Sequence, residues 1–309
     1  MKWSFSHRAS FRRCQRQWYY RHVLANARAK DPLRQEAYRL SKLVTVYSWR
    51  GKLVDNVISH VVVPALNQGH RVGLDEALRA ALIEFEAGMA ASAPRHRSGA
   101  DRQASDGSSP AFFEIEYGST LTDQVLQQAR SDVEQSLSNF FANSCLWNLL
   151  QGANRLIAQR SLSFTHDDTA VSAVPDLIVF YPSANPLIVD WKVHRNPVPD
   201  SWLQLATYAV ALARCKPHRD WPVASTTDDP SRIRLVELQL LNSETREHAV
   251  TPEDVEDLQN LISDSATEML LSLGTRRARA LDPQDFPVAG RPTTCQVCNF
   301  RKLCWEGEP

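Results

Sequence analysis

Apolar positions recur with a helical period through the first half of the chain. They predict one helix over residues 4–30, a second over 40–66 and a third over 74–86. A further helix is expected over residues 122–150. The stretch before it, residues 91–110, is rich in small, polar, proline and glycine residues and is expected to be a mobile loop.

After about residue 152 the pattern changes from helical to extended. Three runs rich in β-branched and aromatic residues predict an antiparallel meander over residues 156–164, 170–181 and 187–193. A helix over residues 201–214 and a fourth strand over 233–241 are expected to follow.

The last predicted helix carries clear start signals. Thr251 suits the N-cap, Pro252 the first helical position, and the acidic Glu253 and Asp254 suit the positive end of the helix dipole. This helix is expected to reach about residue 273. The order of elements predicts an α/β fold, with a small mixed sheet flanked by helices and a helical N-terminal part.

The same patterns divide the chain into three parts that are expected to form one integrated domain. Residues 1–150 are a helical N-terminal region, residues 151–280 carry the sheet, and residues 281–309 form a cysteine-rich clasp expected to pack with Cys14. No apolar run approaches the roughly 18 residues that span a bilayer, and the N-terminus lacks the apolar core of a secretory signal. A cytoplasmic protein with no membrane partner is therefore expected.

Charge is distributed unevenly although the formal net charge is zero. The first thirty residues contain many lysines and arginines but no acidic residue, and Arg12, Arg13 and Arg16 lie at the centre of this basic stretch. Local basic patches bind phosphates whatever the total charge, so these three arginines are candidate DNA contacts. A solvated helix face is the alternative.

Two charged residues follow a buried run on the third predicted strand. Asp190 and Lys192 stand two residues apart, so their side chains share one face. Asp176 lies on the preceding strand, and antiparallel pairing would bring both carboxylates within reach of one ion. Carboxylates suit Mg²⁺ or Mn²⁺, which would activate a water, and Lys192 would position that water or stabilise charge. A surface ion pair would explain Asp190 and Lys192 equally well if they stood alone.

Three motifs in order resemble the PD-(D/E)XK nuclease superfamily, in its RecB-like branch: Pro175-Asp176, Asp190-Trp191-Lys192 and Gln204-Leu-Ala-Thr-Tyr208. The resemblance implies a restriction-endonuclease-like core and a metal-dependent DNA nuclease. It also implies catalytic roles for the carboxylates and the lysine. Gln204 and Tyr208 are four residues apart, so they share a helix face and could reach DNA together.

The upstream motif departs from the family pattern. RecB-like nucleases carry a helix motif Gly-x-x-x-His whose histidine is a further metal ligand. Here Gly51 has Asp55 in the histidine's place, and His60 follows five residues later. Asp55 is the preferred ligand and His60 the second choice, and both together remain an option.

Three cysteines near the C-terminus, Cys295, Cys298 and Cys304, are closely spaced, as soft metal ligands often are. Cys14 is the natural candidate for a fourth ligand. The pattern resembles that of iron–sulfur RecB-like nucleases, including the AddB nuclease domain and the CRISPR-associated exonucleases. That resemblance implies a 4Fe–4S cluster that staples the two ends of the chain together. Zinc on the same four thiolates is the alternative.

The resemblance implies an exonuclease on single-stranded or end-bearing DNA, in DNA repair, recombination or phage defence. Trp18, Tyr19 and Tyr20 could stack on bases, or they could belong to the core. The chain has no phosphate-binding loop of the helicase type, so unwinding would need a helicase partner. A catalytically silent DNA-binding subunit with a structural cluster is the alternative function.

Overall fold

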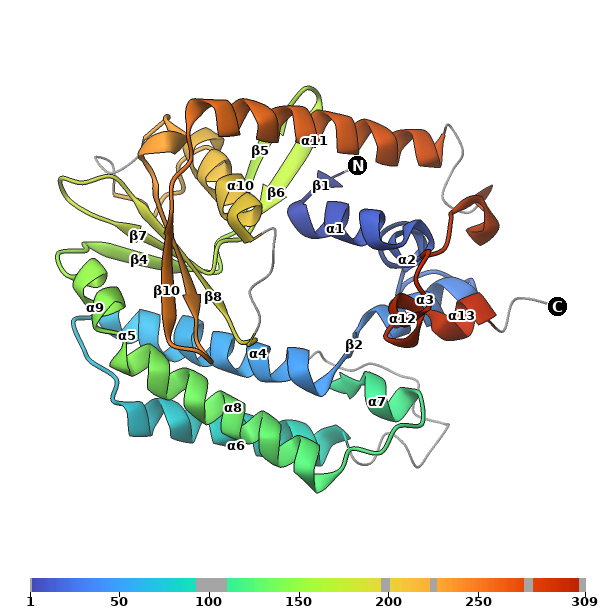
Figure 1. Ribbon diagram of the computed structural model, residues 1–309, viewed down its shortest axis with the longest axis horizontal. Coiled ribbons are helices and arrows are strands. Elements are labelled where there is room, and N and C mark those ends of the chain that lie inside the picture. The colour runs from blue at the N-terminus through green and yellow to red at the C-terminus, as the bar shows by residue number, and fades with distance from the viewer. Residues whose placement is uncertain (1, 93–109, 196–200, 223–226, 275–279, 306–309) are drawn as a thin grey trace. The chain divides into compact units, whose positions relative to one another are not determined.

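The computed structural model describes residues 2–92, 110–195, 201–222, 227–274 and 280–305 (Figure 1). They form two compact units. The terminal unit comprises Met1–Leu43, Thr165–Val171 and Gln259–Pro309, and the central unit comprises Val44–Phe164 and Ser172–Leu258. Nearly all of the predicted loop 91–110 lies outside the described residues.

A five-stranded mixed sheet forms the centre of the central unit. Its strand order is β10-β9-β8-β7-β4; β8 and β9 run parallel, and the other neighbours are antiparallel. The strands are β4 (Arg155–Ala158), β7 (Leu177–Phe180), β8 (Leu187–Lys192), β9 (Arg234–Gln239) and β10 (Glu244–His248). The protein therefore has the predicted α/β fold with a mixed sheet.

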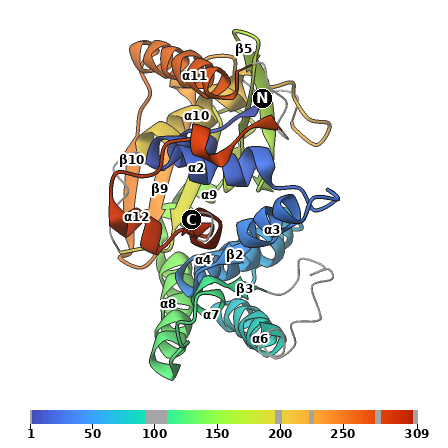
Figure 2. The same ribbon diagram turned by 90° about the vertical axis from the view of Figure 1, so that its right-hand side faces the viewer.

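Helices cover both faces of this sheet. Helices α4 (Val46–Val57), α6 (Leu74–Ser92) and α8 (Asp123–Ala142) lie side by side in both views (Figures 1 and 2). They share one apolar cluster with alternate residues of β8, namely Leu187, Val189 and Trp191. Helix α10 (Ser201–Arg214) packs on β8 and β9. Because strand side chains alternate, Asp190 and Lys192 point away from the apolar cluster.

Capping residues divide the long helices that the apolar period predicts. The helix expected over 122–150 breaks at Asn143, which has a ψ of 90° and caps α9 (Ser144–Leu150) by accepting a bond from the Leu146 amide. The helix expected over 40–66 begins only after Thr45, an extended N-cap, and continues through a π-helical turn, η2 (Ile58–Val62), into α5 (Val63–Asn67). Side chains that accept hydrogen bonds from nearby backbone amides therefore set the helix boundaries here, where the apolar period alone predicts a continuous helix.

Local breaks also divide the N-terminal helix and two of the predicted strands. The strand expected over 156–164 is divided between β4 and β5 (Leu162–His166). The helix expected over 4–30 breaks at Cys14, whose φ of −165° separates α1 (Phe5–Arg13) from α2 (Gln15–Tyr19). The strand expected over 170–181 is interrupted around Pro175, between β6 (Thr169–Ala173) and β7. The remaining elements are η1 (Tyr20–Leu24), α3 (Pro32–Ser41), β1 (Lys2–Trp3), β2 (Leu43–Val44), β3 (Ala111–Phe112), α7 (Phe113–Glu116), η4 (Pro230–Arg232), α11 (Pro252–Leu273), η6 (Pro283–Asp285), α12 (Pro292–Gln296) and α13 (Arg301–Trp305).

Aromatic side chains join the two ends of the chain inside the terminal unit. Tyr19 stacks on Phe286 with ring centroids 4.3 Å apart, and Tyr20 stacks on Phe300 at 5.5 Å. The Tyr19 hydroxyl donates to the Leu281 carbonyl. Trp18 and both tyrosines are at most 2% exposed. The base-stacking hypothesis for these three residues is therefore wrong, because their rings are in the core.

No helix in the described part of the chain is both long and apolar enough to cross a bilayer.

Candidate active site

Strand β8 presents Asp190 and Lys192 on one face, as the spacing predicts. The Lys192 ammonium lies 2.6 Å from Asp190 Oδ2, and Asp190 is 1% exposed. The apolar residues before Asp190 are fully buried, so the strand holds this carboxylate inside the unit. A charge in that position is stabilised only by a paired cation.

Asp176, the residue directly before β7, lies opposite Asp190. The register that pairs Leu177 with Val189 puts the two aspartates side by side one residue further along. The Trp191 amide donates to Asp176 Oδ2 at 2.9 Å. Burial and the charge of Asp190 together raise the pKa of Asp176 well above its ordinary value. Burial also raises the pKa of Asp190, and Lys192 partly offsets this rise. Without a cation, the pair therefore resists carrying two charges.

Asp55 reaches the same place from helix α4. Its Oδ1 accepts hydrogen bonds from Gln159 Nε2 at 2.7 Å, from the Trp191 indole at 3.1 Å and from the Ser59 hydroxyl at 3.2 Å. Gln159 Nε2 also donates to Asp176 Oδ1 at 3.0 Å, so one amide joins the two carboxylates. Burial raises the pKa of Asp55. Three carboxylates from α4, β7 and β8 thus converge.

His60, the second candidate for the upstream position, lies apart from this group. Its side chain is exposed, and its Nδ1 lies 3.1 Å from the Asn56 carbonyl. Its influence on the site is electrostatic, because its charge lowers the pKa of Asp55. The structure therefore brings Asp55 to Asp176 and leaves His60 on the solvent side of the helix.

Gln204 and Tyr208 extend the polar group along α10. Gln204 Oε1 accepts from Lys192 Nζ at 3.0 Å, and Gln204 Nε2 donates to the Tyr208 hydroxyl at 2.5 Å. Burial and the charges of Asp190 and Asp176 raise the pKa of Tyr208 well above its ordinary value, so the phenol keeps its proton. A continuous hydrogen-bonded chain runs from Asp190 to Tyr208.

Two residues of the site carry no motif and escape sequence analysis. Gln159 follows β4 with a φ of +50°, a conformation that non-glycine residues seldom adopt. Its backbone N–H donates to the backbone carbonyl of Asp176. Glu237 pairs with Asp190 in the parallel register and is fully buried, and its charge raises the pKa of Asp190. The sequence offered one signal for Glu237, because it is the single glutamate among the apolar residues of the strand Arg234–Gln239. The sequence contains no comparable signal for Gln159.

The chemistry of these side chains fits a hard divalent cation. Asp190 Oδ1 is buried, and no described residue forms a hydrogen bond with it. Burial raises the pKa values of Asp55 and Asp176, and the charge of Asp190 adds to the rise at Asp176, so a bound cation would favour the ionised carboxylates. In the described part of the chain, however, no three histidine, cysteine or acidic side chains are already arranged to hold a metal ion.

The four predicted cluster cysteines all belong to the terminal unit. Burial, and after it the nearby Cys304, Cys14 and Cys295, raise the pKa of Cys298 to about 11. The Gln17 amide donates to Cys14 Sγ at 3.4 Å. Burial therefore disfavours the thiolate of Cys298 unless a cation compensates it. Among the described residues, the cysteines are not arranged around a common metal position.

The three arginines proposed to contact DNA differ in their surroundings. Arg12 is exposed and lies 3.7 Å from Glu268. Arg13 donates to the Gln17 side chain. Arg16 is only 7% exposed, and its guanidinium donates to the Phe286 carbonyl and to Gln284. The DNA-contact prediction is therefore corrected for Arg16, because its donors already hold the C-terminal segment.

Comparison with known proteins identifies the family. The family model of the PD-(D/E)XK nuclease superfamily matches residues 2–305. No curated protein matches the chain. Among solved structures, the chain is similar to SSO0001, with 13% identity over 64% of this chain and 80% of that one and a TM-score of 0.30. It is also similar to a protein of Eubacterium rectale named "Putative exonuclease", with 8% identity over 91% and 93% of the two chains and a TM-score of 0.35.

The family match covers almost the whole chain, including every residue of the carboxylate group. Superfamily membership implies DNA as the substrate, and nucleases of this superfamily generally use divalent metals such as Mg²⁺. The chain belongs to the PD-(D/E)XK nuclease superfamily and is a nuclease that hydrolyses phosphodiester bonds.

Proposed function

We infer that the protein is a Mg²⁺- or Mn²⁺-dependent deoxyribonuclease whose active site is the group around Asp55, Asp176, Asp190 and Lys192. The observation that carries this proposal is the convergence of the three carboxylates, with Gln159 bonded to both Asp55 and Asp176. Lys192, two residues beyond Asp190, adds a positive charge beside these carboxylates.

The three aspartates would hold the metal ion. When bound, the ion supplies an activated water and neutralises charge that develops on the phosphate. The Lys192 ammonium forms an ion pair with Asp190 and donates a hydrogen bond to Gln204 Oε1. These two contacts hold the ammonium beside the carboxylate group. Lys192 therefore orients the water or the phosphate, and Gln204 and Tyr208 fix the position of Lys192.

We assign the protein to the RecB-like branch, acting as an exonuclease on single-stranded or end-bearing DNA in DNA repair, recombination or phage defence. Support comes from the Gln204–Tyr208 pair, which belongs to the helix that follows β8 directly in the described chain. A helicase partner in a cytoplasmic complex would supply unwinding.

We further propose that Cys14, Cys295, Cys298 and Cys304 hold a 4Fe–4S cluster, with zinc as the alternative metal. Support comes from Cys298, whose pKa is raised first by burial and then by the nearby Cys304, Cys14 and Cys295. Backbone amides also donate to two sulfurs, Cys14 Sγ and Cys298 Sγ, and such bonds tune iron–sulfur centres. The cluster would hold the two ends of the chain in one unit.

Cleavage of end-labelled single- and double-stranded DNA in Mg²⁺ and in Mn²⁺ tests the proposed function. Asp190→Asn and Lys192→Met should each abolish cleavage, while the proteins remain folded and still bind DNA. Asp257→Asn is the matched control, because Asp257 is an exposed carboxylate on α11 and its loss should leave the rate unchanged. Cleavage at the wild-type rate by both active-site variants would refute the assignment.

A further inference from the structure

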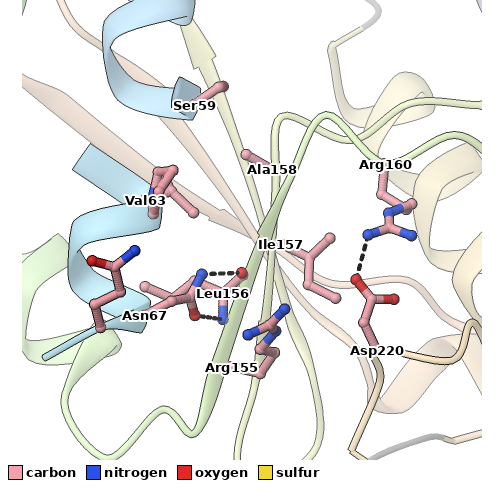
Figure 3. A pocket seen from close by; sticks show the side chains of 11 residues that line it. Ser59, Val63, Asn67, Arg155, Leu156, Ile157, Ala158, Arg160 and Asp220 are labelled. Carbon is pink, nitrogen blue, oxygen red and sulfur yellow. Dashed lines mark hydrogen bonds and ion pairs between the residues drawn. The ribbon is translucent and has the colours of Figure 1, made fainter. Parts of the chain in front are cut away.

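A groove runs along strand β4, one of the two edge strands of the five-stranded sheet in the central unit. It has a volume of about 380 Å³ and lies between helix α5 and the segment that carries Asp220 (Figure 3). The side chains that give it polar character are Ser59, Asn67, Gln68, Arg155, Arg160 and Asp220. No motif identified in the sequence covers this groove.

Asn67 closes the free edge of β4. Its amide nitrogen donates to the Leu156 carbonyl at 2.8 Å, and its oxygen accepts from the Leu156 amide at 2.9 Å. Leu156 therefore points both backbone groups away from β7 and already has partners for them. An extended peptide that paired with β4 would have to displace Asn67, so the groove is poorly suited to adding a strand.

Positive charge is available inside the groove. The Nε atom of Arg155 is buried, and no described residue forms a hydrogen bond with it. Arg160 is held in place by Asp220, to which it donates a short hydrogen bond, and its other terminal nitrogen lies 3.1 Å from His218 Nδ1. Asp220 compensates one of the two guanidinium groups, so Arg155 remains to attract an anion.

One end of the groove lies next to residues that contact or adjoin the carboxylate group, although the three aspartates do not line it. In Figure 3, Ser59 and Ala158 lie at one end and Arg155 at the other. The Ser59 hydroxyl donates to Asp55, and Ala158 directly precedes Gln159, which bonds both Asp55 and Asp176. A DNA strand bound at the proposed metal site would therefore reach Arg155 if it ran alongside β4.

We propose that this groove binds the sugar–phosphate backbone of the DNA strand being cut, with Arg155 contacting a phosphate next to the scissile one. The inference rests on the proposed function and adds the path of the strand. Arg155 supplies the free charge, Gln68 supplies a neutral donor, and Asp220 limits affinity by neutralising Arg160. These contacts involve only the backbone of the nucleic acid, so binding is independent of sequence.

Equilibrium binding of a fluorescent oligothymidylate, titrated at several salt concentrations in the Asp190→Asn background, tests the groove. Adding Arg155→Gln should weaken binding about tenfold, the effect of losing one charge-assisted hydrogen bond. The slope of log affinity against log salt should also fall by about 0.7, because one phosphate contact is lost. The matched control is Arg130→Gln, an exposed arginine on α8, which should change neither quantity.

A second variant should act in the opposite direction. Asp220→Asn removes the negative charge that pairs with Arg160 and should tighten binding with a steeper salt slope. A misfolded protein would not bind DNA more tightly, so a gain in affinity distinguishes an electrostatic effect from a loss of folding. Unchanged affinity and slope in Arg155→Gln, or weaker binding in Asp220→Asn, would overturn the groove assignment.

The two proposals fail in different ways. If wild-type protein cleaves DNA and Asp190→Asn does not, the nuclease assignment holds whatever the groove variants do. If an extended peptide competes with oligothymidylate, and competes better after Asn67→Ala, β4 is a strand-pairing edge and the phosphate path is refuted.

Discussion

The buried ion pair between Arg50 and Asp132 should contribute strongly to the stability of the central unit. Arg50 on α4 and Asp132 on α8 are 8% and 2% exposed, and they form a short salt bridge. Arg50 also donates to the Val193 carbonyl at 3.1 Å, immediately after Lys192. The pair therefore ties two helices to the end of the strand that carries Lys192, the proposed active-site lysine.

Replacing Asp132 by alanine would leave the Arg50 guanidinium buried without its counter-ion. Breaking a buried pair on one side costs about 3–5 kcal/mol. The exposed pair Arg130–Glu134 on the same helix provides the control, because its side chains are 45% and 43% exposed. Such an i,i+4 pair contributes about 0.3–0.5 kcal/mol, so Glu134→Ala should hardly change stability.

Urea unfolding followed by circular dichroism measures the difference. With a slope of about 2–3 kcal/mol per molar urea, Asp132→Ala should lower the midpoint of the central unit's transition by about 1–2 M. The double variant Arg50→Met/Asp132→Leu should restore most of the loss, because it removes both charges together. A midpoint for Asp132→Ala no lower than that of Glu134→Ala would refute the reasoning.

Two further predictions concern the carboxylate group and the cysteines. The raised pKa of Asp176 means that the folded state binds its proton more tightly than the unfolded chain does, so ionisation costs stability as pH rises above about 4. In EDTA, Asp176→Asn should therefore melt above wild type at pH 8, and the gap should close toward pH 4; a lower melting temperature at pH 8 would contradict this. Protein purified without oxygen should be brown and contain iron, and Cys14→Ser should lose both colour and thermal stability while Cys145→Ser, at an exposed thiol, keeps them. Colourless wild-type protein with stoichiometric zinc would favour the zinc alternative, and full metal content in Cys14→Ser would exclude Cys14 as a ligand.

The sequence alone determined the fold class and the core of the proposed active site. Asp190 and Lys192 are two residues apart on a strand, and strand geometry puts both on one face. A short antiparallel connection then brings Asp176 opposite Asp190. These features depend on local periodicity and on a brief turn, so spacing is enough to predict them.

The tertiary structure decided what depends on contacts between distant residues. Gln159 bonds Asp55 across 104 positions, and no local pattern distinguishes it from any other glutamine that follows a strand. The choice between Asp55 and His60 depended on which side of the helix faced the sheet, and packing determines that rotation. Breaks at Cys14 and Asn143 also escaped prediction, because a capping side chain competes with the helix at a single residue. Periodicity thus reveals the faces of an element, whereas only the packed chain reveals which neighbour each face meets.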